Sequence, residues 1–182
     1  GDGRKIIWDQ YSALIFRHNP NIARPNEKHS TNLDWVPFYA GHRVYNRRDG
    51  DRWIWNYEFR AVPGEVLFSP DEIAFARKLP QGFVLIEPNV PQFKSAAPNK
   101  TWPWERYQAV ANGLGAAGYE VRQFLYPGAQ RLVGVEGISA PTFRHALAAM
   151  ARARLYIGPE GGLHHGAAAL GIRAVVIFGG FV

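Results

Sequence analysis

The chain has 182 residues, 47% hydrophobic and 20% charged, which is typical of a globular protein that buries a core. It contains no long apolar run without charges, so we expect no membrane-spanning helix. The absence of cysteine excludes disulfides and thiolate metal sites, and we expect a cytoplasmic protein without a signal peptide. The net charge of +6 favours anionic partners, and because the basic residues are spread along the chain, a small phosphorylated ligand is as good a candidate as a polymer.

The first 80 residues carry the weaker pattern. Extended segments are expected at residues 5–8, 13–16 and 52–59. The last of these, RWIWNYEF, sets its four aromatic side chains on one face at period two. We expect this face to pack against helices of the same protein; the alternative is stacking on a saccharide or on single-stranded nucleic acid.

A helix start stands at Ser69-Pro70-Asp71-Glu72. It combines a serine cap, a proline at the first helical position and a glutamate three residues after the cap. The helix is expected to run to about Leu79, where Pro80 ends it. The break at Pro80-Gln81-Gly82 predicts a boundary between a partial N-terminal domain at 1–80 and a second domain at 82–182.

From residue 83 onward, short apolar runs alternate with helical segments. This alternation predicts right-handed βαβ units and a parallel sheet, so the second domain is expected to be a Rossmann-like α/β domain. Strands are expected at 83–86, 119–125, 133–138, 155–157 and 174–178, and helices at 104–117, from Pro141 through Met150, and at 161–170.

Ligands of open parallel sheets bind at the carboxyl ends of the strands, which here lead into loops at 87–103, 126–131 and 158–163. A helix that starts near Gly161 exposes backbone N–H groups and the positive end of its dipole. The two glycines Gly161 and Gly162 let a ligand approach these groups closely. The turn therefore predicts a diphosphate cradle.

The same turn carries a carboxylate and two histidines. Glu160 cannot bind phosphate but accepts hydrogen bonds from sugar hydroxyls, and helix capping is an equally weighted alternative. His165 lies about one turn into the helix and can donate to a phosphate, whereas His164 is interpreted as solvated or packed. A zinc site is disfavoured, because adjacent histidines on a helix point in different directions and no third ligand is suitably spaced.

A second candidate group lies in the segment NKTWPWE at residues 99–105. A lysine just ahead of a helix, in a loop that leaves a strand, suits a phosphate contact, and the next residue adds a hydroxyl. A surface role is commoner for any single lysine, but the Trp-Pro-Trp context makes this loop rigid and favours function. Lys100 and Thr101 are therefore candidate binding residues.

Together, the Lys-x-Trp-Pro loop at 100–103 and the Glu-Gly-Gly-x-x-His turn at 160–165 resemble the C-terminal domain of glycosyltransferase family 9, the ADP-heptose:lipopolysaccharide heptosyltransferases. The resemblance covers residues from about 82 to 182. It implies a GT-B-like fold of two Rossmann-like domains, with the nucleotide-sugar donor bound by the C-terminal one and a less regular, partial α/β domain before it.

The resemblance also implies roles for individual residues. Lys100 takes the place of the lysine that contacts the donor diphosphate. The turn that binds donor sugar and phosphate falls on Glu160, Gly161, Gly162 and His165, with Glu in place of the family's Asp and Gly161 in place of its hydroxyl residue. The family's ribose-binding acidic residue has only Gln130 near its position.

The implied reaction is an inverting, metal-independent sugar transfer from a nucleoside diphosphate sugar, with an ADP-linked donor favoured, to a saccharide or lipid-saccharide acceptor. No cofactor is expected, because Lys100 and the helix N-terminus replace a metal at the diphosphate. The family's N-terminal glycine-rich loop, with the Asp proposed as base, has no counterpart at the start of this sequence. We expect the base to lie outside the given chain, and the chain ends themselves indicate flanking residues.

Two other classes of protein stay open. A protein without catalysis would bind a nucleotide sugar, or nucleic acid through the aromatic and arginine-rich stretch at 47–60. A non-hydrolysing epimerase shares the two-domain layout but needs catalytic carboxylates in both domains. Localisation at the cytoplasmic side of the inner membrane, as a peripheral protein, follows from the resemblance alone.

Overall fold

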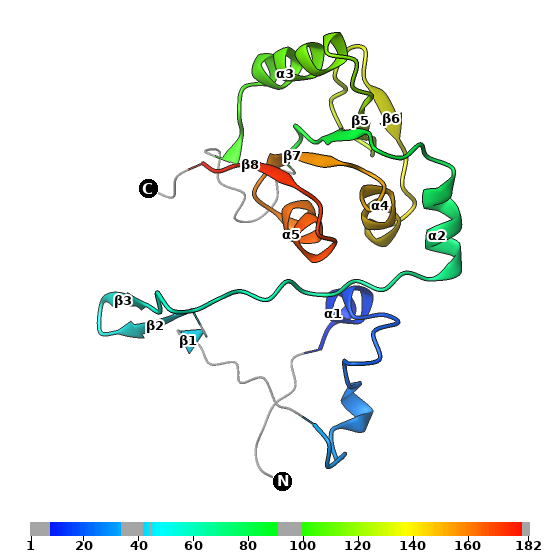
Figure 1. Cartoon of the computed structure of the whole chain (residues 1–182). Coiled ribbons are helices and arrows are strands. Elements are labelled where there is room, and N and C mark those ends of the chain that lie inside the picture. Colours follow the sequence, from blue (N-terminus) through cyan, green and yellow to red (C-terminus); the bar gives the residue numbers. More distant parts are fainter. Residues whose placement is uncertain (1–7, 34–41, 44, 91–99, 180–182) are drawn as a thin grey trace.

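The computed structural model describes residues 8–33, 42–43, 45–90 and 100–179 (Figure 1). These residues form a five-stranded sheet with the order β6-β5-β4-β7-β8 and a separate three-stranded antiparallel sheet. All neighbours in the larger sheet are parallel, as predicted. Within the described residues, no helix combines the length and the apolar character needed to cross a bilayer. The larger sheet contains β4 (Val84–Ile86), β5 (Val121–Phe124), β6 (Glu136–Ile138), β7 (Leu155–Pro159) and β8 (Ala174–Ile177).

Three helices cover the two faces of this sheet. α3 (Trp104–Ala116) lies on one face, and α4 (Phe143–Met150) and α5 (Gly162–Ala169) lie on the other (Figure 1). Side chains of a strand alternate between the faces, so β4 contributes to two separate cores. Val84 and Ile86 pack with α3, whereas Leu85 packs on the side of α4 and α5.

The helix expected after Ser69 is confirmed as α2 (Pro70–Arg77). The Ser69 hydroxyl accepts a hydrogen bond from the N–H of Glu72, and the Glu72 carboxylate accepts one from the N–H of Ser69. This helix packs against α4. The division into two domains at 80–82 stays a prediction.

A buried arginine ties the N-terminal half to the parallel sheet. Arg144, in α4, has no exposed surface and donates to both carboxylate oxygens of Glu72, at 2.6 and 2.8 Å. It also donates to the carbonyls of Leu14, Ile15 and Leu67. Burial alone would raise the pKa of Glu72, but the hydrogen bonds from Arg144 and from the N–H of Ser69 hold it below its usual value.

The first difference from the prediction lies near the N-terminus. The chain around 13–16 was expected to be extended, but it forms α1 (Gln10–Ile15) and its C-cap. The Asp9 side chain accepts a hydrogen bond from the N–H of Ser12 at 2.8 Å, and this cap starts the helix. A short 3-10 helix, η1 (Pro25–Glu27), follows. Residues 5–7 of the strand expected at 5–8 lie outside the described residues.

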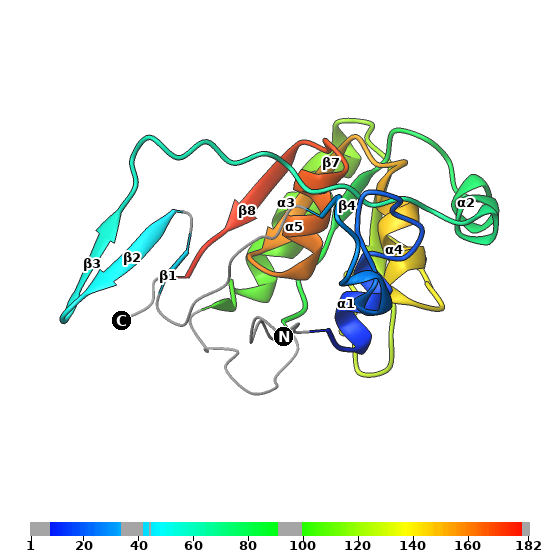
Figure 2. The same ribbon diagram turned by 90° about the horizontal axis from the view of Figure 1, so that it is seen from below.

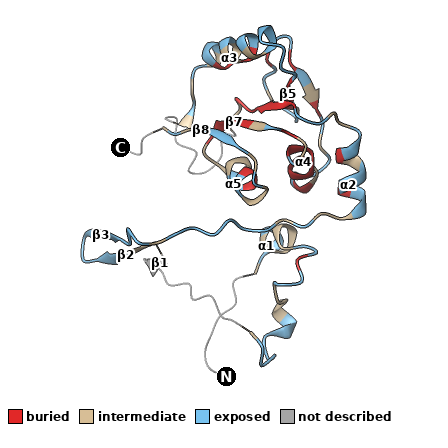
Figure 3. Ribbon diagram, viewed as in Figure 1, coloured by how far each residue is buried: buried red, intermediate tan, exposed pale blue. Residues whose placement is uncertain are grey.

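Of the aromatic stretch expected to be extended at 52–59, only residues 52–55 form a strand, in an exposed hairpin, and the chain turns at residues 57–58. The predicted face of four aromatic side chains and its packing against helices are therefore wrong. The small sheet contains β1 (His42–Arg43), β2 (Asn46–Asp49) and β3 (Arg52–Trp55), and Figures 1 and 2 show the hairpin standing away from the parallel sheet. Trp53 and Trp55 are about half exposed, and the nearest ring to Trp55 among the described residues is Tyr45, with centroids 6.3 Å apart. Figure 3 shows buried residues in β5, β7 and α4, whereas β8, at the edge of the parallel sheet, contains exposed and half-buried residues.

Candidate functional site

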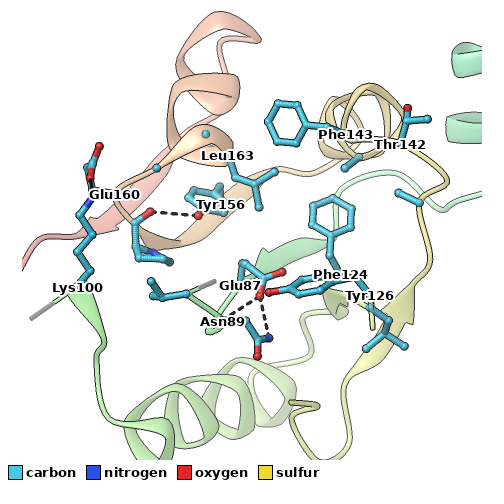
Figure 4. Close-up of a pocket in the computed structure, with 17 residues that line it drawn as sticks. Glu87, Asn89, Lys100, Phe124, Tyr126, Thr142, Phe143, Tyr156, Glu160 and Leu163 are labelled. Atoms are coloured by element: carbon cyan, nitrogen blue, oxygen red, sulfur yellow. Dashed lines mark hydrogen bonds and ion pairs between the residues drawn. The ribbon is translucent and has the colours of Figure 1, made fainter. Parts of the chain in front are cut away.

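A pocket of about 600 Å³ opens at the carboxyl edge of the parallel sheet. Its walls come from the ends of β4, β5 and β7 and from the first turns of α4 and α5 (Figure 4). Carboxyl ends of neighbouring parallel strands converge on one edge, which is where open α/β sheets bind ligands. Four of the predicted site residues line this pocket: Lys100, Glu160, Gly161 and Gly162.

The start of α5 presents backbone N–H groups to the pocket. Gly161 is the N-cap and makes no side-chain capping hydrogen bond, and the first bond within the helix runs from His165 N to Gly161 O at 3.1 Å. The N–H groups of the first turn therefore precede the helix's own hydrogen bonds and add to the positive end of its dipole. A Cβ at Gly161 would meet no atom within 4 Å, whereas one at Gly162 would lie 3.2 Å from the Phe143 ring.

An ion pair lies beside this helix start. The Lys100 Nζ is 2.6 Å from Oε2 of Glu160, and the two side chains are 22% and 28% exposed. The hydrogen bond from Lys100 holds the pKa of Glu160 below its usual value. Glu160 is therefore a charged partner of the lysine in this structure, and the N-cap position itself is occupied by Gly161.

A buried glutamate forms the floor of the pocket. Glu87, directly after β4, is 3% exposed, and its Oε1 accepts hydrogen bonds from the backbone N–H and the side-chain amide of Asn89, at 3.0 and 2.9 Å. Its Oε2 has no hydrogen-bond partner among the described residues. Burial raises the pKa of Glu87 to about 7, against the opposing effect of the Asn89 hydrogen bonds.

Asn89 connects this floor to the loop after β5. Its Oδ1 accepts from the backbone N–H of Gln130 at 2.9 Å, and its Nδ2 donates to the Gln130 carbonyl. The buried Gln123 donates to the same carbonyl and accepts from Leu132 N. Gln130 therefore contributes to this network through its backbone N–H and carbonyl. It is not among the residues that line the pocket, so the ribose contact predicted for Gln130 stays a prediction.

The far side of the pocket is apolar. Phe124 and Tyr126 come from the end of β5, Phe143 from α4 and Leu163 from α5 (Figure 4). Tyr156, from β7, is buried and donates its hydroxyl to the Pro159 carbonyl at 3.3 Å. The pocket therefore has a charged end at Lys100 and Glu160, an acidic floor at Glu87 and an aromatic end.

Two further predicted residues, Thr101 and His165, are not among the pocket's lining. Thr101 is exposed, and the His165 side chain is 72% exposed with its Nε2 3.7 Å from Oε1 of Glu160. The sequence-based reasons against a metal site are wrong, because the rings of His164 and His165 stack 4.8 Å apart and Glu160 is a suitably placed third group. The potential ligand atoms of these three residues lie within 4.8 Å of one another. The Lys100 ammonium on the same carboxylate opposes a cation there by charge repulsion. Burial lowers the pKa of His164.

Sequence reasoning missed Glu87, Asn89 and the aromatic wall. The sequence does carry a sign of the first two, because Glu87-Pro88-Asn89 follows a fully apolar strand at the edge where ligands bind. The aromatic residues resemble ordinary core positions in their pattern, since Phe124 ends an alternating strand and Phe143 begins an amphipathic helix.

Residues 51–180 match the sequence profile described as Glycosyltransferase family 9 (heptosyltransferase). A solved structure of a glycosyl transferase family 9 protein from Veillonella parvula aligns with 24% identity and a TM-score of 0.50, over 63% of this chain and 37% of that chain. The present chain thus spans little more than a third of the length of that protein. No curated protein sequence matches the chain.

Two solved structures from E. coli also align with the chain. The ADP-heptose LPS heptosyltransferase II aligns with 19% identity and a TM-score of 0.48, over 62% of this chain and 38% of that one. Heptosyltransferase WaaC with ADP aligns with 17% identity and a TM-score of 0.47, over 56% and 35% of the two chains.

Proposed function

Since the chain belongs to glycosyltransferase family 9, we propose that it binds a nucleoside diphosphate sugar and takes part in transferring the sugar to a hydroxyl acceptor. The observation that carries this proposal is the position of Lys100 beside the first turn of α5, in one pocket at the carboxyl edge of the sheet. An ammonium and a row of backbone N–H groups are the two kinds of donor that phosphate oxygens prefer.

The diphosphate is assigned to the charged end of the pocket. Gly161 leaves open space at its Cα, so phosphate oxygens can approach the N–H groups of the first turn of α5. The helix dipole and the Lys100 charge both favour an anion there. Both act without a metal ion, which supports the proposal of metal-independent transfer.

The donor sugar is assigned to Glu160. Its carboxylate accepts hydrogen bonds from sugar hydroxyls but repels phosphate, so it suits the part of the donor next to the diphosphate. Its Oε2 contacts Lys100, and a diphosphate at α5 competes for the same ammonium. Binding of the donor then transfers Lys100 from Glu160 to the phosphates and leaves the carboxylate for the sugar.

The proposed chemistry is an inverting displacement. A general base removes the proton from the acceptor hydroxyl, the oxygen attacks the anomeric carbon, and the bond to the nucleoside diphosphate breaks on the opposite side. Negative charge grows on the leaving diphosphate, so Lys100 and the α5 N–H groups stabilise the transition state more than the ground state. We assign no described residue to the role of the base.

The finer identity of the substrates is part of the same proposal. An ADP-linked sugar is proposed as the first choice of donor, because the matching family is described as heptosyltransferases and one solved heptosyltransferase that aligns with the chain is a structure with ADP. The acceptor is proposed to be a saccharide or a lipid-linked saccharide. With such an acceptor, the proposed location is the cytoplasmic side of the inner membrane, where the protein would act as a peripheral enzyme of lipopolysaccharide synthesis.

A thermal-shift screen of the full chain tests the proposal. ADP, UDP, GDP, inorganic pyrophosphate, ADP-linked sugars and a single-stranded oligonucleotide are compared at two salt concentrations. Ligand binding to the folded state raises the melting temperature by mass action, so ADP and ADP-sugars are expected to stabilise the protein. Stabilisation by the oligonucleotide alone, with steep salt dependence, would replace the transferase by a nucleic-acid-binding function.

A further inference from the structure

One buried polar atom at the floor of the pocket is left without a partner in the described part of the chain. This atom is Oε2 of Glu87, a residue that is only 3% exposed. Buried polar atoms in folded proteins are nearly always hydrogen-bonded, so an exception in a pocket points to a ligand atom.

The surrounding network determines which oxygen faces the ligand. Asn89 donates twice to Oε1 of Glu87, and Asn89 is itself held at both ends of its amide by the backbone of Gln130. With Oε1 and Asn89 occupied, Oε2 is the atom of the Glu87 carboxyl group that still lacks a hydrogen-bond partner among the described residues, in a residue that lines the pocket.

The position of Glu87 between the two ends of the pocket indicates which part of a nucleotide it meets. Lys100 and the start of α5 lie at the phosphate end, and the rings of Phe124 and Tyr126 lie toward the other end (Figure 4). A flat base stacks on aromatic side chains, and its edge then needs a hydrogen-bonding group. Glu87 lies close enough to Tyr126 to perturb the titration of its hydroxyl.

We propose that Glu87 recognises the base of the bound nucleotide through a hydrogen bond at Oε2, with the base packed against Phe124 and Tyr126. The proposal rests on the donor site described above and adds the residue that selects the base. It favours a base with an acceptor atom, such as a purine ring nitrogen, because the neutral carboxyl is a donor at Oε2.

The electrostatics of the floor favour this neutral form. Burial raises the pKa of Glu87 to about 7. Among the described residues, the titratable groups that face it are Tyr107 of α3, Tyr126 after β5 and Tyr156 of β7, all with a pKa raised by burial and all uncharged near neutral pH. A diphosphate at the Lys100 end adds negative charge to the same pocket and favours the protonated acid further.

Calorimetric titration of ADP and of inorganic pyrophosphate into the full chain and two variants tests this assignment. Glu87→Leu removes the hydrogen-bonding group, and Glu87→Gln keeps a donor of the same shape. We expect Glu87→Leu to weaken ADP binding by about tenfold and Glu87→Gln to stay within about threefold of the unmodified protein. Pyrophosphate, which has no base, is expected to bind all three proteins equally.

The pH dependence gives a second readout. Between pH 6 and pH 8 the neutral fraction of an acid with a pKa of about 7 falls by about tenfold, so ADP binding to the unmodified protein should weaken by about that factor. In Glu87→Gln, the affinity for ADP should depend on pH no more strongly than the affinity for pyrophosphate does. A melting curve for each variant establishes that it is folded.

Three outcomes overturn the proposal, each in a different way. Normal ADP binding by Glu87→Leu removes Glu87 from the site while leaving the donor site intact. The second outcome is that the unmodified protein binds 2′-deoxy-ADP as weakly as Glu87→Leu binds ADP. This result would show that Glu87 contacts the ribose and not the base. Failure of the unmodified protein to bind either ADP or pyrophosphate rejects the proposed function and this inference with it.

Discussion

The ammonium of Lys100 lies 2.6 Å from Oε2 of Glu160, although the two residues are 60 positions apart in the chain. Lys100 precedes α3, and Glu160 directly follows β7, so the contact forms where the central strands of the sheet end. The pair brings the cation proposed to bind phosphate and the carboxylate proposed to bind the sugar to one point beside the start of α5. Each half of the pair makes a separate prediction.

Lys100→Ala is expected to weaken ADP binding by about 10- to 100-fold, because a charge-assisted hydrogen bond to phosphate contributes about 1.5–3 kcal/mol. Calorimetric titration measures the change, and the melting temperature should move little because the side chain is partly exposed. The exposed Lys78→Ala is the matched control and should bind ADP normally. Unchanged affinity in Lys100→Ala would remove this lysine from the site.

Glu160→Gln is expected to separate bare nucleotide from nucleotide sugar. Removal of the carboxylate charge weakens the contact between Glu160 and Lys100 that competes with phosphate, so ADP should bind as tightly as before or more tightly. An ADP-sugar should lose about tenfold in affinity, because a neutral amide accepts hydroxyl hydrogen bonds less strongly than a carboxylate. Parallel titrations with ADP and an ADP-sugar measure both effects, and equal losses for the two ligands would argue against a sugar contact.

Gly161→Val is expected to weaken ADP binding by at least about tenfold through steric filling, with little change in melting temperature. The Cβ of the new valine would enter open space at the pocket. Gly161 has a φ of 161°, which is an extended backbone conformation that other residues also adopt. Gly162→Val is the less clean test, since its Cβ presses on Phe143.

The control for the glycine experiment is Gly113→Ala, in the exposed part of α3. Its Cβ meets nothing within 4 Å, so the variant should gain about 0.5–1 kcal/mol of stability and bind ADP normally. Normal ADP affinity in Gly161→Val would contradict the assignment of phosphate to the start of α5.

Arg144→Met is expected to lower the free energy of unfolding by about 3–5 kcal/mol, because it leaves the Glu72 carboxylate buried without its partner. Urea denaturation measures this loss. The double variant Arg144→Met/Glu72→Leu should recover a large part of it, since no buried charge then lacks a partner. Equal losses in the single and double variants would show that the carbonyl contacts of Arg144, rather than the ion pair, hold the N-terminal segment.

Glu87 is expected to make the protein less stable as the pH rises. Its pKa is raised from 4.5 to about 7, so the folded state holds the proton more firmly than the unfolded state. The contribution of protonated Glu87 is complete below about pH 4.5 and is lost between there and about pH 7, a change of about 3 kcal/mol. Urea denaturation across pH 5 to 8 should show this slope in the unmodified protein and a flatter one in Glu87→Gln.

The difference between these two proteins is the quantity to measure, because the Lys100–Glu160 pair has the opposite dependence. The lowered pKa of Glu160 gives a contribution that is present above its unfolded value and is lost at more acidic pH. Identical slopes for the unmodified protein and Glu87→Gln would mean that Glu87 is charged in the folded state.

Local features explain why so much of the second half could be predicted. The apolar runs at β4, β7 and β8, the capping box at Ser69 and the glycine turn at the start of α5 all act over a few neighbouring residues. Periodicity and capping are properties of the chain itself, so sequence reasoning recovers the helices, the strands and the parallel sheet.

The N-terminal half shows where such reasoning stops. The segment expected to be extended at 13–16 forms part of α1 and its C-cap, because the Asp9 side chain caps the start of this helix. Residues 52–55 of the aromatic stretch form a strand of an exposed hairpin. An alternating pattern predicts a strand face but does not say what covers that face. Whether a strand meets a helix or solvent depends on contacts between distant segments.

By itself, the sequence determined the parallel sheet, the open helix start at Gly161 and the candidates Lys100 and Glu160, since each follows from residues close together in the chain. The tertiary structure alone decided that Lys100 contacts Glu160, that Glu87 lines the pocket, and that Oε2 of Glu87 has no hydrogen-bond partner in the described residues. Burial and long-range pairing set the protonation of a carboxyl group, and both arise only when distant strand ends meet at one edge of the sheet.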